Sequence, residues 1–176
     1  MNAQDGLIAE NLAALQQAVD LIEQITDDQY TSNDHPIFSS GVGKHIRHIL
    51  DFYAAFLGAE DDRVNYDARG RSTDVESSRE AAVVRIRETM GALRRVGHPD
   101  TPLVSKNDDC GERDPAVEYS PSSIGRELQF LASHTVHHYA IVAMIMHSLG
   151  VEIPIDFGVA PSTLAYWRRQ AQSGSK

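Results

Sequence analysis

The chain has a single cysteine, Cys110, among its 176 residues. One cysteine forms no disulfide within the chain, and a zinc site built from several thiolates is excluded for the same reason. Cys110 lies in the polar segment Lys106–Asp114, where acidic neighbours raise a thiol pKa. A cysteine nucleophile is therefore not favoured.

The chain also lacks a basic excess and a long hydrophobic run. Its net charge of −9 repels phosphate backbones and anionic lipids, so neither nucleic acid nor a membrane is an expected partner. The longest apolar run, Tyr139–Met146, is too short to span a bilayer. Met1–Gly6 has no basic region followed by an apolar core, which predicts a cytoplasmic location.

Apolar residues repeat at helical spacing in long stretches of the chain. Apolar content of 41% and charged content of 23% are typical of a globular protein, and the length suits one domain over residues 1–176. The absence of strand and helix alternation predicts an all-α four-helix bundle with long polar crossover loops and a short C-terminal helix. The expected helices are Ile8–Ile25, Gly41–Leu57 with Ser39 or Ser40 as its cap, Thr73 or Asp74 to Val96, Ser120 to Leu149, and a short one from Ser162.

Two connections stand out by their length. Residues 60–74 form a polar loop in which Tyr66, Arg69 and Arg71 could bind an anionic substrate or simply face solvent. Residues 99–119 are predicted to contain a small hairpin, with Leu103-Val104 and Ala116–Tyr119 as its extended pieces.

The last long helix carries three of the eight histidines, His134, His137 and His138. His134 and His138 lie one turn apart and share a face with the apolar positions of the helix, so we expect their rings inside the buried stripe. That stripe comprises Leu131, Ile141, Val142, Ile145 and Leu149. Two buried imidazoles need hydrogen-bond partners or a shared cation. A hydrogen-bonded core pair and a metal site both satisfy this requirement.

A metal site needs a third ligand, and the second helix offers two histidines. Its apolar arc runs through Val42, Ile46, Ile49, Phe52, Tyr53 and Phe56. His45 lies just inside the edge of this arc and His48 just outside it, so periodicity slightly favours His45 without deciding. Asp51 could orient an imidazole or face solvent. Three imidazoles with an open fourth position are typical of a reactive rather than a structural zinc site.

Two stretches resemble the DinB/YfiT-like superfamily of four-helix bundles. They are Ser40-Gly-Val-Gly-Lys-His-Ile-Arg-His-Ile-Leu-Asp51 on the second helix and His134-Thr-Val-His-His138 on the last. The resemblance implies that His48, His134 and His138 bind metal, with His45 and His137 as neighbours. Tyr139-Ala140 stand where the family often has Arg-Gly.

The resemblance further implies a metal-dependent enzyme. One divalent ion, Zn, Ni or Fe, would activate water or a low-molecular-weight thiol for a small-molecule substrate, giving a hydrolase or a thiol transferase. It also implies a homodimer. The alternative is a non-catalytic helical bundle, stabilised by metal or by hydrogen bonds, that acts through dimerisation or a protein partner.

Overall fold

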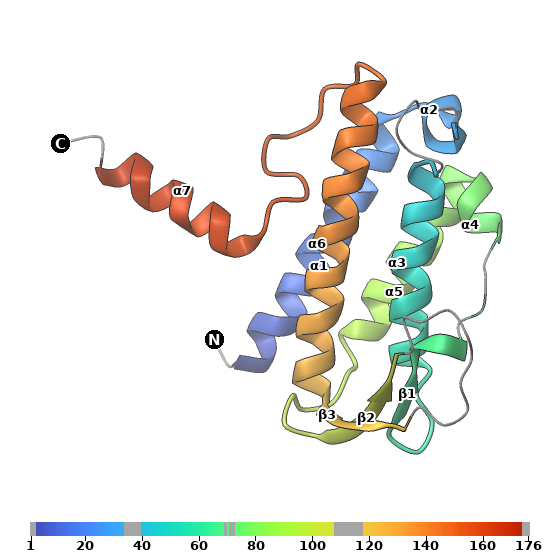
Figure 1. The fold of residues 1–176 in the computed structure, drawn as a ribbon, viewed down its shortest axis with the longest axis vertical. Coiled ribbons are helices and arrows are strands. Elements are labelled where there is room, and N and C mark those ends of the chain that lie inside the picture. Colours follow the sequence, from blue (N-terminus) through green and yellow to red (C-terminus); the bar gives the residue numbers. More distant parts are fainter. Residues whose placement is uncertain (1–2, 34–39, 69, 71–72, 108–117, 174–176) are drawn as a thin grey trace.

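The computed structural model describes residues 3–33, 40–68, 70, 73–107 and 118–173. Four long helices, α1, α3, α5 and α6, run side by side, and a small sheet covers one end of them (Figure 1). The all-α fold predicted from periodicity is confirmed. The elements are α1 (Ala3–Gln24), α2 (Asp27–Thr31), α3 (Val42–Leu57), β1 (Arg63–Asn65), a 3-10 turn (Tyr66–Ala68), α4 (Thr73–Ser77), α5 (Arg79–Leu93), β2 (Pro102–Lys106), β3 (Ser120–Ser123), α6 (Ile124–Ser148) and α7 (Pro161–Ser173).

The core lies where the four long helices face one another. Leu15 and Ile22 of α1, Ile46 of α3 and Ile86 of α5 are almost completely buried, as is Leu128 of α6. These positions recur every three or four residues along each helix, which is why each helix presents one apolar face. Removing these side chains from water is the main force that holds the bundle together.

The buried face of α6 differs from the stripe expected around its histidines. It is centred on Leu128, Thr135, Tyr139 and Met146, all fully buried. Leu131, Val142 and Ile145 are buried as expected, but Ile141 and Leu149 are only half-buried. His134 and His138 are half-buried as well, so they lie at the edge of the buried face rather than within it. Thr135 and Tyr139 occupy the centre because their hydroxyls find partners there.

The two long connections, predicted as a polar loop and a small hairpin, instead contribute to one three-stranded sheet. β1 pairs parallel to β2, with Val64 opposite Ser105, and β2 pairs antiparallel to β3, with Val104 opposite Pro121. Leu103-Val104 is extended as expected and pairs with Ser120–Ser123, whereas the predicted piece Ala116–Tyr119 lies partly outside the described residues. Residues 108–117, with Cys110, lie outside the described residues.

Several expected helix boundaries are wrong because capping hydroxyls start helices elsewhere. α6 begins at Ile124, where Ser123 Oγ accepts a hydrogen bond from the Arg126 amide, and not at Ser120. The third predicted helix is split at Ser78, whose hydroxyl caps α5. Thr26 and Gln29 form a capping box that starts α2, a helix that is not among those expected.

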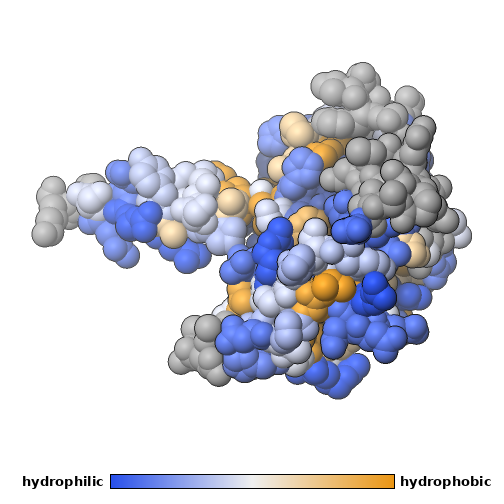
Figure 2. Space-filling model, turned by 60° about the horizontal axis from the view of Figure 1, so that its bottom comes forward, coloured by the Kyte–Doolittle hydropathy of each residue, from blue (hydrophilic) through white to orange (hydrophobic). Residues whose placement is uncertain are grey.

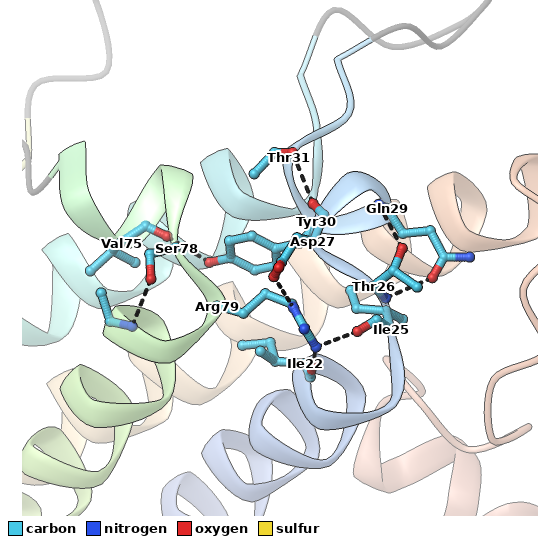
Figure 3. Close-up of polar contacts among 11 residues, drawn as sticks. Ile22, Ile25, Thr26, Asp27, Gln29, Tyr30, Thr31, Val75, Ser78 and Arg79 are labelled. Atoms are coloured by element: carbon cyan, nitrogen blue, oxygen red, sulfur yellow. Dashed lines mark hydrogen bonds and ion pairs between the residues drawn. The ribbon is translucent and has the colours of Figure 1, made fainter.

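One arginine ties three of the helices together near the end of α1 (Figure 3). Arg79, the first residue of α5, donates hydrogen bonds to the carbonyls of Ile22 and Ile25 and to the carboxylate of Asp27. A cation is favourable at a helix C-terminus because the last carbonyls have no partners within the helix. Beside it, the Tyr30 hydroxyl donates to the Val75 carbonyl. These contacts fix α2 and α4 against the bundle.

The last helix, α7, leaves the bundle. Figure 1 shows α7 pointing away from α6, and Figure 2 shows it as a separate arm with a mostly hydrophilic surface. No described residue of α7 is buried, and Tyr166 and Trp167 are exposed. None of the described helices is long and apolar enough to cross a membrane.

Candidate metal centre

The position of α3 depends on two glycines at its start. A Cβ on Gly41 would lie 1.9 Å from the carbonyl oxygen of Ser32, and a Cβ on Gly43 would lie 2.2 Å from that of Glu76. Both neighbours are backbone atoms, so only glycine permits this approach. The N-cap is Gly41 and not Ser40, one of the two expected caps; the other, Ser39, lies outside the described residues. The first turns of α3 are thereby fixed against the neighbouring segments, and the α3 histidines with them.

Three histidines meet where α3 faces α6. His48, His134 and His138 each offer a ring nitrogen, and these nitrogens lie within 4.8 Å of one another. The ring centroids of His48 and His138 are 4.6 Å apart, and those of His134 and His138 are also 4.6 Å apart. The structure therefore brings together the same three residues that the family resemblance selected.

His45, which periodicity slightly favoured as a ligand, has a different place. It is buried, with 9% of its surface exposed, whereas His48 is half-buried. His45 Nδ1 lies 2.9 Å from His138 Nδ1, and its Nε2 lies 3.0 Å from Ser40 Oγ. His45 is thus a hydrogen-bonding neighbour of the cluster and not part of it.

The surroundings lower the pKa of two of these imidazoles, His138 and His45. Burial, followed by repulsion from His48, His45 and His137, lowers the pKa of His138 to about 3. Burial, followed by repulsion from His137, lowers the pKa of His45. A neutral imidazole has a lone pair to give to a cation, whereas a protonated one has none.

An aromatic wall, formed by Phe52, Tyr66 and Phe130, flanks His134. The Phe52 and His134 ring centroids are 4.1 Å apart, and Phe130 stacks on His134 at 5.7 Å. Tyr66 stacks on Phe52 at 5.2 Å. An apolar wall lowers the local dielectric constant, which strengthens interactions of a nearby charge.

Tyr66 was considered either to bind an anionic substrate or to face solvent, and its buried position fits neither role. It is buried, and its hydroxyl donates a 2.7 Å hydrogen bond to Glu127, which also accepts one from Ser122. Burial, followed by this contact with Glu127, raises the pKa of Tyr66. Tyr66 therefore anchors the 3-10 turn to α6. Arg69 and Arg71 lie outside the described residues.

Asp51 and His137 also receive definite positions. Asp51, which could have oriented an imidazole or faced solvent, is buried, and its carboxylate pairs with Arg47 at 2.8 Å. His137 is exposed, with its ring centroid 5.3 Å from that of His138.

Sequence reasoning missed Glu127 and the aromatic wall. Glu127 is 3% exposed and lies at the start of α6. A signal was available, because Glu127, Leu131, His134 and His138 follow the four-three-four spacing of a single helix face. The wall required knowledge of how the loop after α3 folds back, which periodicity does not supply.

A cleft is also present away from the histidine cluster. Its volume is about 460 Å³, and its lining includes Asp51, Glu60, Arg63 and Tyr119 but none of the histidines. In this cleft, the Arg63 guanidinium lies 4.7 Å from the centroid of the Tyr119 ring. The lining of this cleft combines acidic residues with an arginine. The histidine cluster is the better candidate site, because its side chains are suited to one chemical role.

The donor set of the cluster fits a divalent transition metal. Ligand nitrogens about 2.1 Å from one tetrahedral ion lie roughly 3.3 Å from each other. The three nitrogens here lie within 4.8 Å of one another, so ion binding would require them to approach by at most about 1.5 Å. Imidazole ligands suit Zn, Ni and Fe, so the donor set does not select one of them.

Comparison with known proteins places the chain. Residues 1–169 match the DinB family. The chain belongs to the DinB family. This DinB protein is 31% identical over 165 residues to "FK506-binding protein 5" of Rhizopus delemar, a match that covers 90% of the chain and 37% of the relative. The chain thus spans little more than a third of that protein's length. No solved structure matches this DinB protein.

Proposed function

We propose that this DinB protein is a metal-dependent enzyme in which His48, His134 and His138 hold one divalent cation. The observation that carries the proposal is the convergence of three ring nitrogens within 4.8 Å from two separate helices. Such a cation, when bound, lowers the pKa of water or a thiol at its open position toward neutrality and so supplies a nucleophile.

The residues around the cluster support this role. Imidazole ligands are neutral when they bind a cation, so they leave its charge undiminished. The aromatic wall of Phe52, Tyr66 and Phe130 shields the His134 side from water. The substrate we propose is a small molecule with an electrophilic carbon.

Two reactions fit such a site. In hydrolysis, water adds across the bond that breaks. In thiol transfer, the sulfur of a low-molecular-weight thiol bonds to the electrophilic carbon, and the leaving group departs with its electron pair and takes up the thiol proton.

Metal analysis of the purified full chain, after growth with Zn, Ni and Fe, tests the proposal. We expect about one equivalent per chain in the wild type and less than about a tenth in His138→Ala. A wild type without metal would refute the proposal. The metal-loaded protein is then assayed with small thiols plus electrophilic acceptors, and with esters.

A second candidate function, pairing with another copy without catalysis, is favoured by α7. This helix is exposed except at the half-buried Leu164 and Ala165, and carries Arg168 and Arg169 without any acidic residue, whereas the chain as a whole has a charge of −9. A 13-residue helix is marginal by itself, and an acidic bundle of a second copy would complement its charge. Sedimentation of the wild type and of Arg168→Glu/Arg169→Glu tests this: a dimer that salt and this variant both dissociate supports it, and a wild-type monomer refutes it.

A further inference from the structure

His45 connects the histidine cluster to the start of α3. One of its ring nitrogens, Nδ1, lies 2.9 Å from His138 Nδ1, and the other, Nε2, lies 3.0 Å from Ser40 Oγ. Both distances are in the range of hydrogen bonds. His45 therefore uses its whole hydrogen-bonding capacity in a chain of contacts that runs from Ser40 to His138.

The contact between two Nδ1 atoms restricts where the protons lie. A neutral imidazole carries one ring proton, so one of the two facing nitrogens donates and the other accepts. If His138 donates, its Nε2 presents a lone pair that can bind a cation. If His45 donates, the proton of His138 is on Nε2, and that nitrogen cannot bind. The direction of one hydrogen bond thus decides whether His138 is a competent ligand.

We propose that His45 is a positioning residue, which accepts the Nδ1 proton of His138 and so directs His138 Nε2 to the cation. This inference rests on the proposed function. The proton of His45 then lies on Nε2 and is donated to Ser40 Oγ. Outer partners of this kind fix the tautomer and the ring orientation of a metal-binding histidine.

The fold holds this chain of hydrogen bonds in place. His45 is only 9% exposed and lies on α3 one turn before His48. Ser40 comes directly before Gly41, whose backbone is fixed by the close approach to Ser32 and by the hydrogen bond from its amide to Asn33. The Ser40 end of the contact chain therefore cannot move far without disturbing the start of α3.

Two substitutions of His45 separate hydrogen bonding from packing. His45→Asn places an amide oxygen close to the position of Nδ1, so it keeps an acceptor for His138. His45→Leu fills similar space without an acceptor. His137→Leu is the matched control, because His137 also lies beside His138, at 5.3 Å between ring centroids, but is exposed. Ser40→Ala removes only the far end of the chain.

Metal affinity and the tautomer of His138 are the readouts. Zn²⁺ dissociation constants from chelator competition should rise about 10- to 100-fold in His45→Leu, and should stay within about threefold of wild type in His45→Asn and His137→Leu. Ser40→Ala should give an intermediate loss. In the Co²⁺-loaded protein, the visible absorption bands should shift in His45→Leu alone. Nitrogen NMR of metal-free protein should find the His138 proton on Nδ1 in the wild type and on Nε2 in His45→Leu.

The outcomes distinguish this inference from the proposed function. If wild type binds metal and His45→Leu binds equally well, the positioning role is wrong while the metal site stands. The same holds if His45→Asn is no better than His45→Leu. If wild type binds no metal, both are wrong. Thermal unfolding of each metal-free variant identifies any change that comes from a damaged fold.

Discussion

Two polar clusters use side chains of both α3 and α6, the inner one together with Asn11 of α1, and they are built in opposite ways. The inner one joins Asn11, Tyr53 and Thr135, all fully buried. Asn11 donates to the carbonyls of Leu7 and Leu128 and accepts from the Tyr53 hydroxyl, so donors meet acceptors throughout. The outer one gathers His48, His134 and His138, half-buried groups of a single kind.

The difference shows how one pair of helices supports two purposes. A cluster that matches donors with acceptors satisfies itself and stabilises the fold, since unpaired buried polar groups are costly. A cluster of like imidazoles, in which the pKa of His138 is lowered, gathers lone pairs, which is the property that a cation requires. Stability and binding should therefore respond to different substitutions, and the predictions below test that separation.

The largest effect is expected at the outer cluster. His134→Ala removes one of the three proposed ligands, so metal affinity should fall by more than about 100-fold, beyond what outer partners contribute. The unfolding free energy of the metal-free protein should change by only about 1 kcal/mol, because the ring is half-buried. Chelator competition and urea unfolding measure the two quantities. His147→Ala, an exposed change on the same helix, serves as the control.

Asn11→Ala should show the reverse pattern. It leaves the carbonyl of Leu128 and the hydroxyl of Tyr53 without their bonds in the core, which should lower the unfolding free energy by about 3 kcal/mol. The zinc dissociation constant should remain within about threefold of wild type, because no ligand moves. Gln16→Ala, which breaks an exposed bond on α1, is the control. Equal damage to stability and to affinity would contradict the separation of the clusters.

Gly43→Ala should affect both clusters, since Gly43 fixes the start of α3. The added Cβ would lie 2.2 Å from the Glu76 carbonyl oxygen, so we expect a loss of about 2 kcal/mol in unfolding free energy together with weaker metal binding. Gly6→Ala is a matched control, because nothing lies within 4 Å of its Cβ position in α1. That control should gain up to about 1 kcal/mol from helix propensity. Tolerance of Gly43→Ala would show that α3 is not held in this way.

The smallest effect is expected at Arg79, away from both clusters. Arg79→Ala removes hydrogen bonds to the carbonyls of Ile22 and Ile25, and should lower the unfolding free energy by about 1 kcal/mol without changing metal affinity. Arg87→Ala breaks only an exposed ion pair with Glu23 and should change the unfolding free energy by less than about 0.5 kcal/mol. Urea unfolding of the two variants compares them directly; equal losses would remove the special role of Arg79.

Sequence periodicity predicted the long helices because their apolar faces repeat over many turns. It failed at the ends and in the connections, where single hydroxyls such as those of Ser78 and Ser123 decide where a helix starts. The strand Ser120–Ser123 contains a proline and no large apolar residue, so no local pattern identifies it. Ser120–Ser123 is a strand because its backbone pairs with β2.

The candidate site was reached only in part from the residues themselves. The spacing of His134 and His138 indicated a shared face, but the edge of the α3 arc could not separate His45 from His48. Family resemblance made that choice, and the structure agrees in bringing His48 to the pair. The position of His45 depends on how closely α3 approaches α6, a property of packing that no single helix encodes. The binding of metal by these residues stays a prediction.

The hydrogen bond from Asn11 to the Leu128 carbonyl spans 117 positions of the chain. During synthesis, α1 is made long before its partner α6. The Asn11 side chain therefore stays hydrated until α6 is present. Loop-closure entropy opposes such distant contacts until the intervening elements have condensed. We therefore expect the contact between α1 and α6 to form late in folding, when α6 docks onto the other helices.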